Sequence, residues 1–330
     1  MNKSNLKVLG AAVIILFALL ATLEFPGREQ SATRGELLFP DLKPLLNEIG
    51  EVAVTRHGAD GTLTIVRNAD NWTVTERGGY VADIGKIREV LLAIAEARVL
   101  EQKTSDPERY QVLGIETPDA ADSAGVAITL AGDDFAVALI VGNTAQSDYR
   151  YVRIADQAQG LLIDRNPDIP ASASGWLLPD IVNIDAANVR AVTITHPDGE
   201  AIHLAKESAE DDAYAVNDIP AGRDLSYPGV ANGIAGVLSD LKLEDVRKSE
   251  PGERTATAKF ETFDGLQLSI PSYKTADGTW IALVADGGVD DQAAAINERV
   301  AGWQYRIADY KANLLMRRWE DILKTPAADE

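Results

Sequence analysis

Apolar and polar residues alternate along three short stretches in the first third of the chain, residues 52–54, 63–65 and 72–75. Alternation with a period of two is typical of a half-buried β-strand. A Gly-containing turn at 60–61 separates the first two stretches, and apolar positions at helical spacing follow at 87–94. The pattern predicts a three-stranded antiparallel meander whose apolar face is covered by an amphipathic helix.

The same order of features returns in the second half of the chain. Strands are expected at 192–194, 202–204 and 214–217, with a turn at 198–199 and a helix over 234–241. Five features that match in order indicate an internal repeat, because chance rarely produces such a match.

Further alternating stretches complete each half. The first half also contains a short helix, which is expected to begin after Asp106 and to end at Gly114. The remaining strands are expected at 126–130, 135–141, 149–154 and 161–163, and then at 258–262, 266–270, 280–284 and 303–307. Two more helices, over 292–301 and 310–323, are expected only in the second half. The sequence thus predicts an α+β protein made of two tandem modules, each an antiparallel sheet with a packed helix.

Changes in composition divide the chain into five parts. Between the modules, Pro, Ser, Ala and Gly replace any hydrophobic period, which is typical of a linker. The predicted parts are a cytoplasmic N-terminus with a transmembrane anchor (1–23), a stalk (24–36), a first α+β module (37–165), a linker (166–175) and a second α+β module with a C-terminal amphipathic helix (176–330).

The predicted anchor depends on the uncharged, apolar run 8–23, which two lysines precede. As a helix this run would be about 24 Å long, close to the ~30 Å hydrocarbon core of a bilayer. A cleaved signal peptide is the alternative, but Leu19 stands where cleavage before residue 22 prefers a small residue. We therefore expect an uncleaved single-pass helix with its N-terminus in the cytoplasm.

Charge and cysteine content restrict the partners and the chemistry. The formal net charge of -20 repels phosphate backbones, so nucleic acid is not expected as a partner. The chain has no cysteine, which excludes disulfides, thiolate zinc sites and thiol catalysis. Its three histidines, His57, His196 and His203, are expected at the surface or on edge strands rather than in a metal or catalytic site.

Sequence motifs of catalysis and cofactor binding are missing. The chain contains no phosphate-binding GxxxxGK[ST], no GxGxxG after a strand, no HExxH and no GxSxG. Acidic pairs at 133–134, 211–212 and 290–291 lie in predicted turns and lack the spacing of a calcium loop. We therefore predict a non-enzymatic protein without cofactor or metal ligands. A hydrolase would require such carboxylates to converge in a pocket.

Two sets of residues are candidates for binding. On the closing helix, Arg317, Arg318 and Trp319 form a basic and aromatic patch for docking on a membrane partner, unless the helix packs on its own module. Five aromatic residues are candidates for a groove between the modules, although strand aromatics commonly pack across their own sheet. These residues are Tyr149, Tyr151, Trp280, Trp303 and Tyr305.

A basic triplet on this acidic chain has two interpretations. Arg150, Arg153 and Arg165 would receive an anionic partner, or they would pair with nearby aspartates.

The order of segments resembles a bacterial family defined by a domain of unknown function, DUF4340. The similarity extends from the anchor to Leu323, and none of its motifs is a catalytic signature. The motifs are Trp72, Tyr110-x-x-Leu113-Gly114-Ile115-x-x-Pro118, Gly142 followed by Tyr149-Arg150-Tyr151-Val152-Arg153, and Trp303-x-Tyr305-x-Ile307-x-x-Tyr310-Lys311. The resemblance implies a membrane anchor followed by extracytoplasmic repeats, in proteins often encoded beside ABC transporter subunits of gliding-motility and auxiliary transport systems.

The anchor and the resemblance together lead to a hypothesis of function. We expect an accessory or scaffold protein of an ABC-type transport complex, with permease or accessory subunits as partners. The expected location is the bacterial inner (cytoplasmic) membrane, with the bulk of the chain in the periplasm. The alternative is a tethered binding protein for a small molecule, glycan or peptide, with its site between the modules.

Overall fold

A computed structural model describes residues 33–58, 61–69 and 71–325 of the chain. The chain divides into two compact units between Ala171 and Ser172, within the segment predicted as a linker. The anchor predicted at 1–23 lies outside the described residues. Among the residues that are described, no helix has the length and apolar character needed to cross a membrane.

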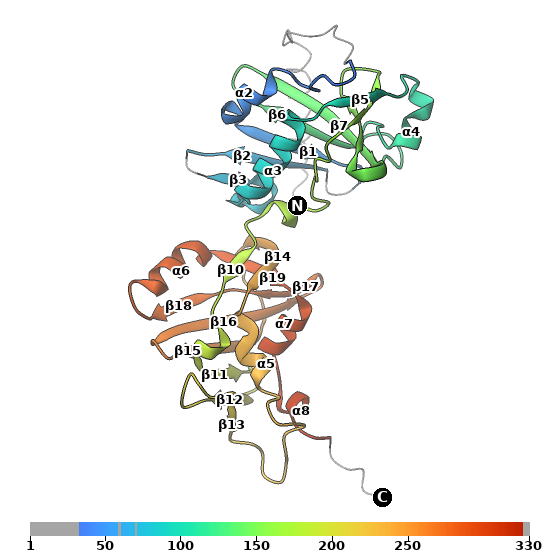
Figure 1. Cartoon of the computed structure of the whole chain (residues 1–330). Coiled ribbons are helices and arrows are strands. Elements are labelled where there is room, and N and C mark those ends of the chain that lie inside the picture. The colour runs from blue at the N-terminus through green and yellow to red at the C-terminus, as the bar shows by residue number, and fades with distance from the viewer. Residues whose placement is uncertain (1–32, 59–60, 70, 326–330) are drawn as a thin grey trace, which may run out of the picture. The chain divides into compact units, whose positions relative to one another are not determined.

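The first unit is built around one antiparallel sheet (Figure 1). Its strands are β1 (Glu51–Thr55), β2 (Thr62–Arg67), β3 (Trp72–Val74), β4 (Tyr80–Val81), β5 (Val99–Gln102), β6 (Val126–Ala131), β7 (Ala136–Thr144), β8 (Arg150–Ile154) and β9 (Gly160–Ile163). They follow the order β4-β3-β2-β1-β6-β7-β8-β9-β5. The predicted meander is confirmed, since β1 pairs with β2 and β2 with β3, both antiparallel.

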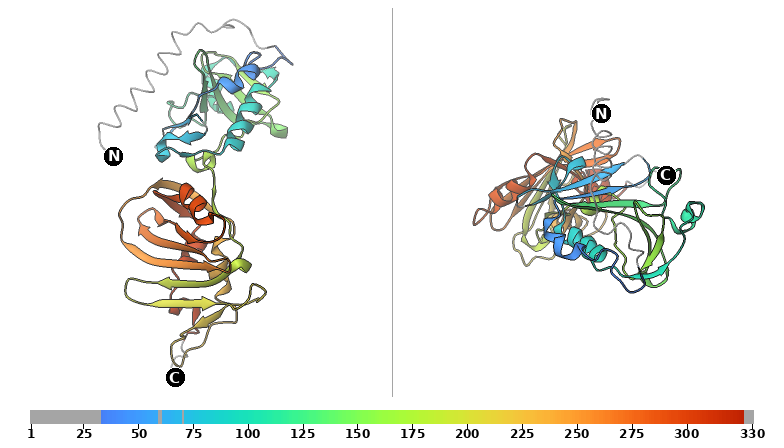
Figure 2. Two further views of the ribbon diagram at one scale, coloured as in Figure 1. Left: turned by 90° about the vertical axis from the view of Figure 1, so that its left-hand side faces the viewer. Right: turned by 90° about the horizontal axis from the view of Figure 1, so that it is seen from above.

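The second unit contains a similar sheet, whose strands form a ladder in Figure 2. Its strands are β10 (Asp180–Val182), β11 (Val189–Thr195), β12 (Ala201–Ala205), β13 (Ala215–Asn217), β14 (Leu241–Lys248), β15 (Arg254–Thr262), β16 (Leu266–Thr275), β17 (Gly278–Ile281), β18 (Val284–Gly287) and β19 (Trp303–Ile307). Their order is β10-β14-β19-β17-β16-β15-β11-β12-β13, and β18 pairs with β16.

The two sheets have the same strand order. The sequence β3-β2-β1-β6-β7-β8-β9-β5 in the first unit corresponds to β13-β12-β11-β15-β16-β17-β19-β14 in the second. In both units, the strand that follows the meander in the chain is separated from it by a helix. The repeat predicted from hydrophobic patterning is therefore present in the sheet topology.

The helices are short apart from two. In the first unit they are α2 (Leu42–Leu45), α3 (Ile84–Ala95) and α4 (Tyr110–Leu113). In the second they are α5 (Asn232–Ala235), α6 (Gln292–Val300), α7 (Asp309–Leu315) and α8 (Trp319–Ile322). Single 3₁₀ turns are found at Leu46–Glu48, Thr75–Arg77, Pro107–Arg109, Gln146–Asp148, Ala173–Trp176, Ala186–Asn188 and Gly236–Leu238.

Helix α3 covers one face of the first sheet (Figure 1). Its N-cap is Asp83, whose carboxylate accepts hydrogen bonds from the amides of Gly85 and Lys86. Apolar side chains at helical spacing are buried, and each contributes about 1.5 to 3 kcal/mol. They are Ile87, Val90, Leu91 and Ile94. Ile84 was predicted in the same stripe, but it is 55% exposed.

Two predicted helices are wrong in length. The helix expected over 234–241 consists of α5 and one 3₁₀ turn, and β14 already begins at Leu241. The closing helix expected over 310–323 is divided into α7 and α8, because Arg318 is extended and the amide of Arg318 donates to the side chain of Asp321. Hydrogen bonds from other parts of the unit end both helices, as described below.

The strand predicted at 280–284 is also divided. Strand β17 ends at Ile281, and Val284 begins β18, so the two pair with opposite ends of β16. Between them the amide of Ala282 donates to the carbonyl oxygen of Pro271. The chain therefore crosses β16 twice on one edge instead of once.

The short helix after Asp106 is confirmed. Asp106 accepts a hydrogen bond from the amide of Glu108, and Gly114 ends the helix with a φ of 67°. Gly142 of β7 lies directly against this helix end, since a Cβ at Gly142 would stand 2.4 Å from the carbonyl oxygen of Leu113.

Replacement of Gly142 by alanine is expected to destabilise the first unit by about 1 to 3 kcal/mol, because a methyl group there overlaps main-chain atoms. Urea unfolding of the full chain, followed by hydrogen exchange in each unit, measures the change. Gly236→Ala is a matched control, because Gly236 has a helical φ of -77° and no atom lies within 4 Å of its added Cβ. Equal effects of the two substitutions would contradict the prediction.

Candidate functional site

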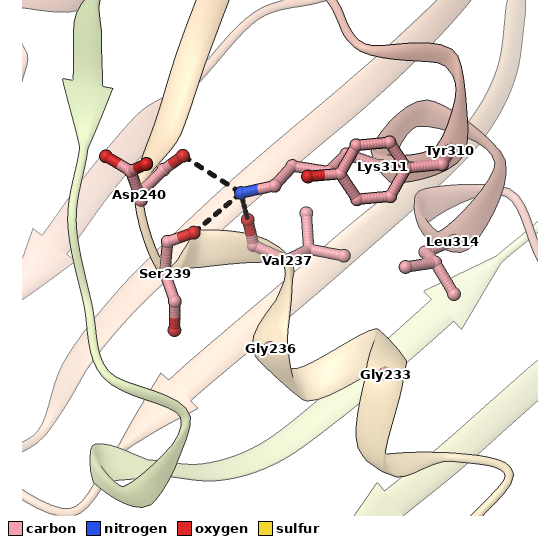
Figure 3. A pocket seen from close by; sticks show the side chains of 8 residues that line it. All are labelled: Gly233, Gly236, Val237, Ser239, Asp240, Tyr310, Lys311 and Leu314. Atoms are coloured by element: carbon pink, nitrogen blue, oxygen red, sulfur yellow. Dashed lines mark hydrogen bonds between the residues drawn. The ribbon is translucent and has the colours of Figure 1, made fainter.

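The second unit has an open cavity of about 390 Å³ between α5 and α7 (Figure 3). These two helices lie beside each other over the sheet (Figure 1). The residues that line the cavity come from the helix after the meander and from the helix after β19. They are Gly233, Gly236, Val237, Ser239, Asp240, Tyr310, Lys311 and Leu314.

Lys311 fixes one wall of this cavity. Its ammonium group donates three hydrogen bonds to main-chain carbonyl oxygens, those of Val237 (3.1 Å), Ser239 (2.6 Å) and Asp240 (3.0 Å) (Figure 3). The three N–H donors of a lysine are thereby all used. Burial lowers the pKa of Lys311, whose side chain belongs to the buried face of α7. The ammonium collects carbonyl groups at the end of the 3₁₀ turn, which explains why the predicted helix stops there.

The opposite side of the cavity is apolar and accessible. Tyr310 is 65% exposed, and Leu314 stands one helical turn after it. Gly233 and Gly236 form the wall contributed by α5 and the following turn. The cavity therefore joins an exposed aromatic ring to a rigid, carbonyl-rich wall, an arrangement that suits a small ligand or a side chain of a partner.

A second cavity, of about 570 Å³, surrounds the start of α8. Arg318 pairs with Asp198 at 2.8 Å and also with Glu200, and the amide of Trp319 donates to Glu200 at 2.7 Å. These contacts connect α8 to the turn between β11 and β12. Arg317 lies 3.9 Å from Asp321 on the same segment.

In the first unit, Arg153 holds a network that connects α4 to the sheet. Its guanidinium donates to the carbonyl oxygens of Ile115 (3.1 Å), Ala155 (3.2 Å) and Gln157 (3.1 Å). It also lies 4.7 Å from the ring centre of Tyr110, whose hydroxyl donates to Ala158. Burial lowers the pKa of Arg153, but an arginine stays charged at neutral pH.

The comparison with known families adds to these observations. The family model described as a domain of unknown function, DUF4340, matches residues 72–260, which is more than half of the 330 residues. The chain belongs to this family. No curated protein and no solved structure matches it.

The DUF4340 match extends across both units. It contains Arg153 and Tyr110 of the first unit, and it ends within β15 of the second. Lys311 and α8 follow the matched region. The motifs that suggested DUF4340 from sequence come together in the first unit, because Gly142, Gly114 and Arg153 all contact the same helix end.

The predicted docking residues lie on the segment that precedes α8 and at its start. Arg317, Arg318 and Trp319 are each partly buried, and two of them bond to Asp198 or Glu200 of the same unit. Docking on another protein stays a prediction, and such a partner would contact the parts of these side chains that line the second cavity or remain exposed.

The five aromatic residues predicted for a groove are distributed over both units. Tyr149 is 37% exposed, whereas Tyr151 packs against the buried cluster around Tyr110. In the second unit the guanidinium of Arg247 lies 4.1 Å from the ring centre of Trp280. The ammonium of Lys248 lies 3.5 Å from that of Trp303, and Tyr305 is buried. Four of the rings thus pack within their own unit, and the groove itself stays a prediction.

The basic triplet is not held mainly by aspartates. Arg153 bonds to the carbonyl oxygens named above, Arg150 donates to Asn166 (2.7 Å) and to Gly142 (3.1 Å), and Arg165 pairs with Glu96 at 3.4 Å. The expectation of pairing with nearby aspartates was wrong because extended main chain crosses this end of the sheet and offers carbonyl oxygens instead.

Half of the predicted linker is attached to the first unit. Lys86 pairs with Asp168 at 2.7 Å, and Arg56 donates to the carbonyl oxygens of Ile169 (3.1 Å) and Pro170 (2.8 Å). Together with Arg150 and Asn166, these contacts form what we call the strap, residues 166–170. Sequence analysis missed it, although the bonded cations come from three separate elements that each carry an isolated basic residue.

The histidines differ from one another. His196 is 5% exposed, so its predicted surface position was wrong, while His57 is exposed and His203 accepts or donates a hydrogen bond to Thr193. Within the described ranges 33–58, 61–69 and 71–325, no group of three or more His, Asp or Glu side chains is placed to hold a metal ion.

Proposed function

We propose that this protein is a non-enzymatic scaffold or accessory subunit of an ABC-type transport complex, anchored in the bacterial inner membrane by residues 8–23. The observation that carries the proposal is the shared strand order of the two units. A chain that presents two related sheets offers two similar surfaces to other subunits, as repeat proteins that bind partners do.

The environment of the buried cations supports a scaffold role. Arg153 and Lys311 each donate three hydrogen bonds to main-chain carbonyl oxygens of their own unit. These charges therefore hold loops and helix ends in place. Such rigid loops are what a surface needs if it is to bind another protein without a large loss of conformational entropy.

A tethered binding protein for a small molecule or peptide is the second candidate. The cavity beside Tyr310 favours it, because about 390 Å³ falls within the range of small-molecule sites. The exposed ring and the neighbouring carbonyl groups would supply stacking and hydrogen bonds. This version places the site within the second unit.

Affinity capture from mildly solubilised native membranes distinguishes the two candidates. Full-length protein is the bait, and a chain lacking residues 1–23 is the control. Stoichiometric recovery of permease and ATPase chains, identified by mass spectrometry, is expected for a scaffold, and dependence on residues 1–23 would place part of the contact in the membrane. Recovery of the bait alone, in a detergent that keeps a known transport complex intact, would contradict the scaffold and favour the tethered binding protein.

A further inference from the structure

Arg56 and His196 occupy equivalent positions in the two units. Each follows the strand that begins the meander, since β1 ends at Thr55 and β11 ends at Thr195. The amide of each also closes the same hairpin, because Arg56 donates to the carbonyl oxygen of Gly61 (3.3 Å) and His196 to that of Glu200 (2.9 Å). The repeat therefore places a basic side chain at one end of the core in each unit.

Both side chains contact the C-terminal segment of their own unit. Arg56 donates to the carbonyl oxygens of Ile169 and Pro170, which follow the last strands of the first unit. Nε2 of His196 lies 3.1 Å from the carbonyl oxygen of Arg317, between α7 and α8. The same device thus closes both units, with a guanidinium in one and an imidazole in the other.

The two hydrogen-bond partners of His196 are both main-chain carbonyl oxygens. Besides the contact of Nε2 with Arg317, Nδ1 lies 3.2 Å from the carbonyl oxygen of Thr255 on β15. A carbonyl oxygen only accepts, and a neutral imidazole has a single N–H. The neutral ring can satisfy one contact and turns a lone pair toward the other oxygen. The imidazolium cation, with two N–H groups, satisfies both.

We propose that His196 is a proton-dependent clasp, which holds residues 317–324 against the second sheet when its ring is protonated and loosens them when the ring is neutral. Arg56 performs the same task in the first unit without dependence on pH, because a guanidinium stays charged. Histidine is the side chain whose ordinary titration falls between about pH 5 and 8. The clasp is therefore tighter on the acidic side of that range and weaker on the alkaline side.

The charged groups around His196 favour this assignment. The turn between β11 and β12 brings Asp198 and Glu200, and the segment before α8 brings Arg317 and Arg318. The Glu200 amide and the Arg318 guanidinium hold the pKa of Asp198 below its usual range. This carboxylate stays ionised between pH 5 and 8, so the Arg318–Asp198 pair does not titrate together with the ring. From β15 the contacting group is a neutral carbonyl.

The remaining contacts of residues 317–324 are few and lie near the surface. The amide of Lys324 donates to the carbonyl oxygen of Asp224, and the carbonyl oxygen of Ile322 accepts from the amide of Ser226, both at 2.9 Å. Loss of one buried contact at Arg317 therefore weakens a segment that has little else to retain it. Because Arg318 and Trp319 line the second cavity, loosening changes that cavity as well.

Hydrogen exchange of the full chain at pH 5.5 and pH 8 tests the clasp. After correction for the intrinsic rates, protection of the amides of Trp319 and Lys324 is expected to be about three- to tenfold greater at pH 5.5. In His196→Gln this difference disappears, while in the control His57→Gln it remains. Equal protection of wild-type protein at both pH values would overturn the proposal, as would a pH difference that survives in His196→Gln.

Nitrogen NMR of the imidazole rings provides a test that needs no folded variant. The proposal predicts two protonated ring nitrogens for His196 at pH 5.5, with both N–H groups in hydrogen bonds. A single neutral tautomer of His196 from pH 5.5 to pH 8 would overturn it.

Discussion

Replacement of Arg153 by alanine is expected to lower the free energy of unfolding of the first unit by about 4 kcal/mol. The substitution leaves three carbonyl oxygens in a buried region without a donor, and each unsatisfied group costs about 1 to 3 kcal/mol. It also removes the stacking of the guanidinium on Tyr110. Because Arg153 is only 6% exposed, water cannot readily replace the lost hydrogen bonds.

Urea unfolding of the full chain, followed by hydrogen exchange mass spectrometry, measures this loss in each unit separately. Exchange in peptides from β6 to β9 should shift to lower urea, and exchange in the second unit should not. Arg165→Ala is the matched control, because that side chain is half exposed and bonds only to Glu96 in the printed contacts of the unit. A loss below about 1 kcal/mol for Arg153→Ala would show that the network is dispensable.

Replacement of Lys311 by methionine is expected to destabilise the second unit by about 3 kcal/mol. Methionine fills a similar volume, so the change mainly removes three charge-assisted hydrogen bonds to the carbonyl groups of Val237, Ser239 and Asp240. The effect is smaller than for Arg153 because the adjoining cavity lets water reach some of the exposed carbonyl groups.

The same unfolding experiment measures this change, now in peptides that contain α5 and β14. Lys242→Met is a control on the neighbouring strand, since the ammonium of Lys242 pairs at the surface with Asp240 and its side chain is 49% exposed. Comparable effects of the two methionine variants would contradict the role assigned to Lys311.

Local patterns predicted the sheets well. The alternation of Val52 and Val54 with polar neighbours reflects burial on one face of β1, where both side chains are at most 3% exposed. Helix α3 was predictable because its apolar stripe, its capping Asp83 and its length all agree. Such features depend on residues close together in sequence.

Long-range hydrogen bonds account for the errors. The helix expected over 234–241 has the correct spacing of apolar residues, but Lys311, far along the chain, attracts its last carbonyl groups. The helix expected over 310–323 is interrupted where Glu200 accepts from the amide of Trp319. Neither partner is visible from the periodicity of the helix itself, so tertiary contacts overrode local propensity.

The candidate site was only partly predictable. Tyr310 and Lys311 were recognised as part of a motif, yet their role depends on glycines of α5 that carry no signal by themselves. One signal was available, because Lys311 stands four residues before Leu315 on the buried face of an amphipathic helix. A cation at such a position indicates a buried set of acceptors.

The strap has a consequence for the strength with which this protein can bind. Pro170 is bonded to the first unit, and Ser172 accepts the hydrogen bond that opens the second, so Ala171 alone stands between them. A partner that engages both units would meet the second at a high effective concentration, because a short tether confines it near the first. Two weak contacts would then combine into strong avidity, and release of the strap would reduce that avidity without altering either binding surface.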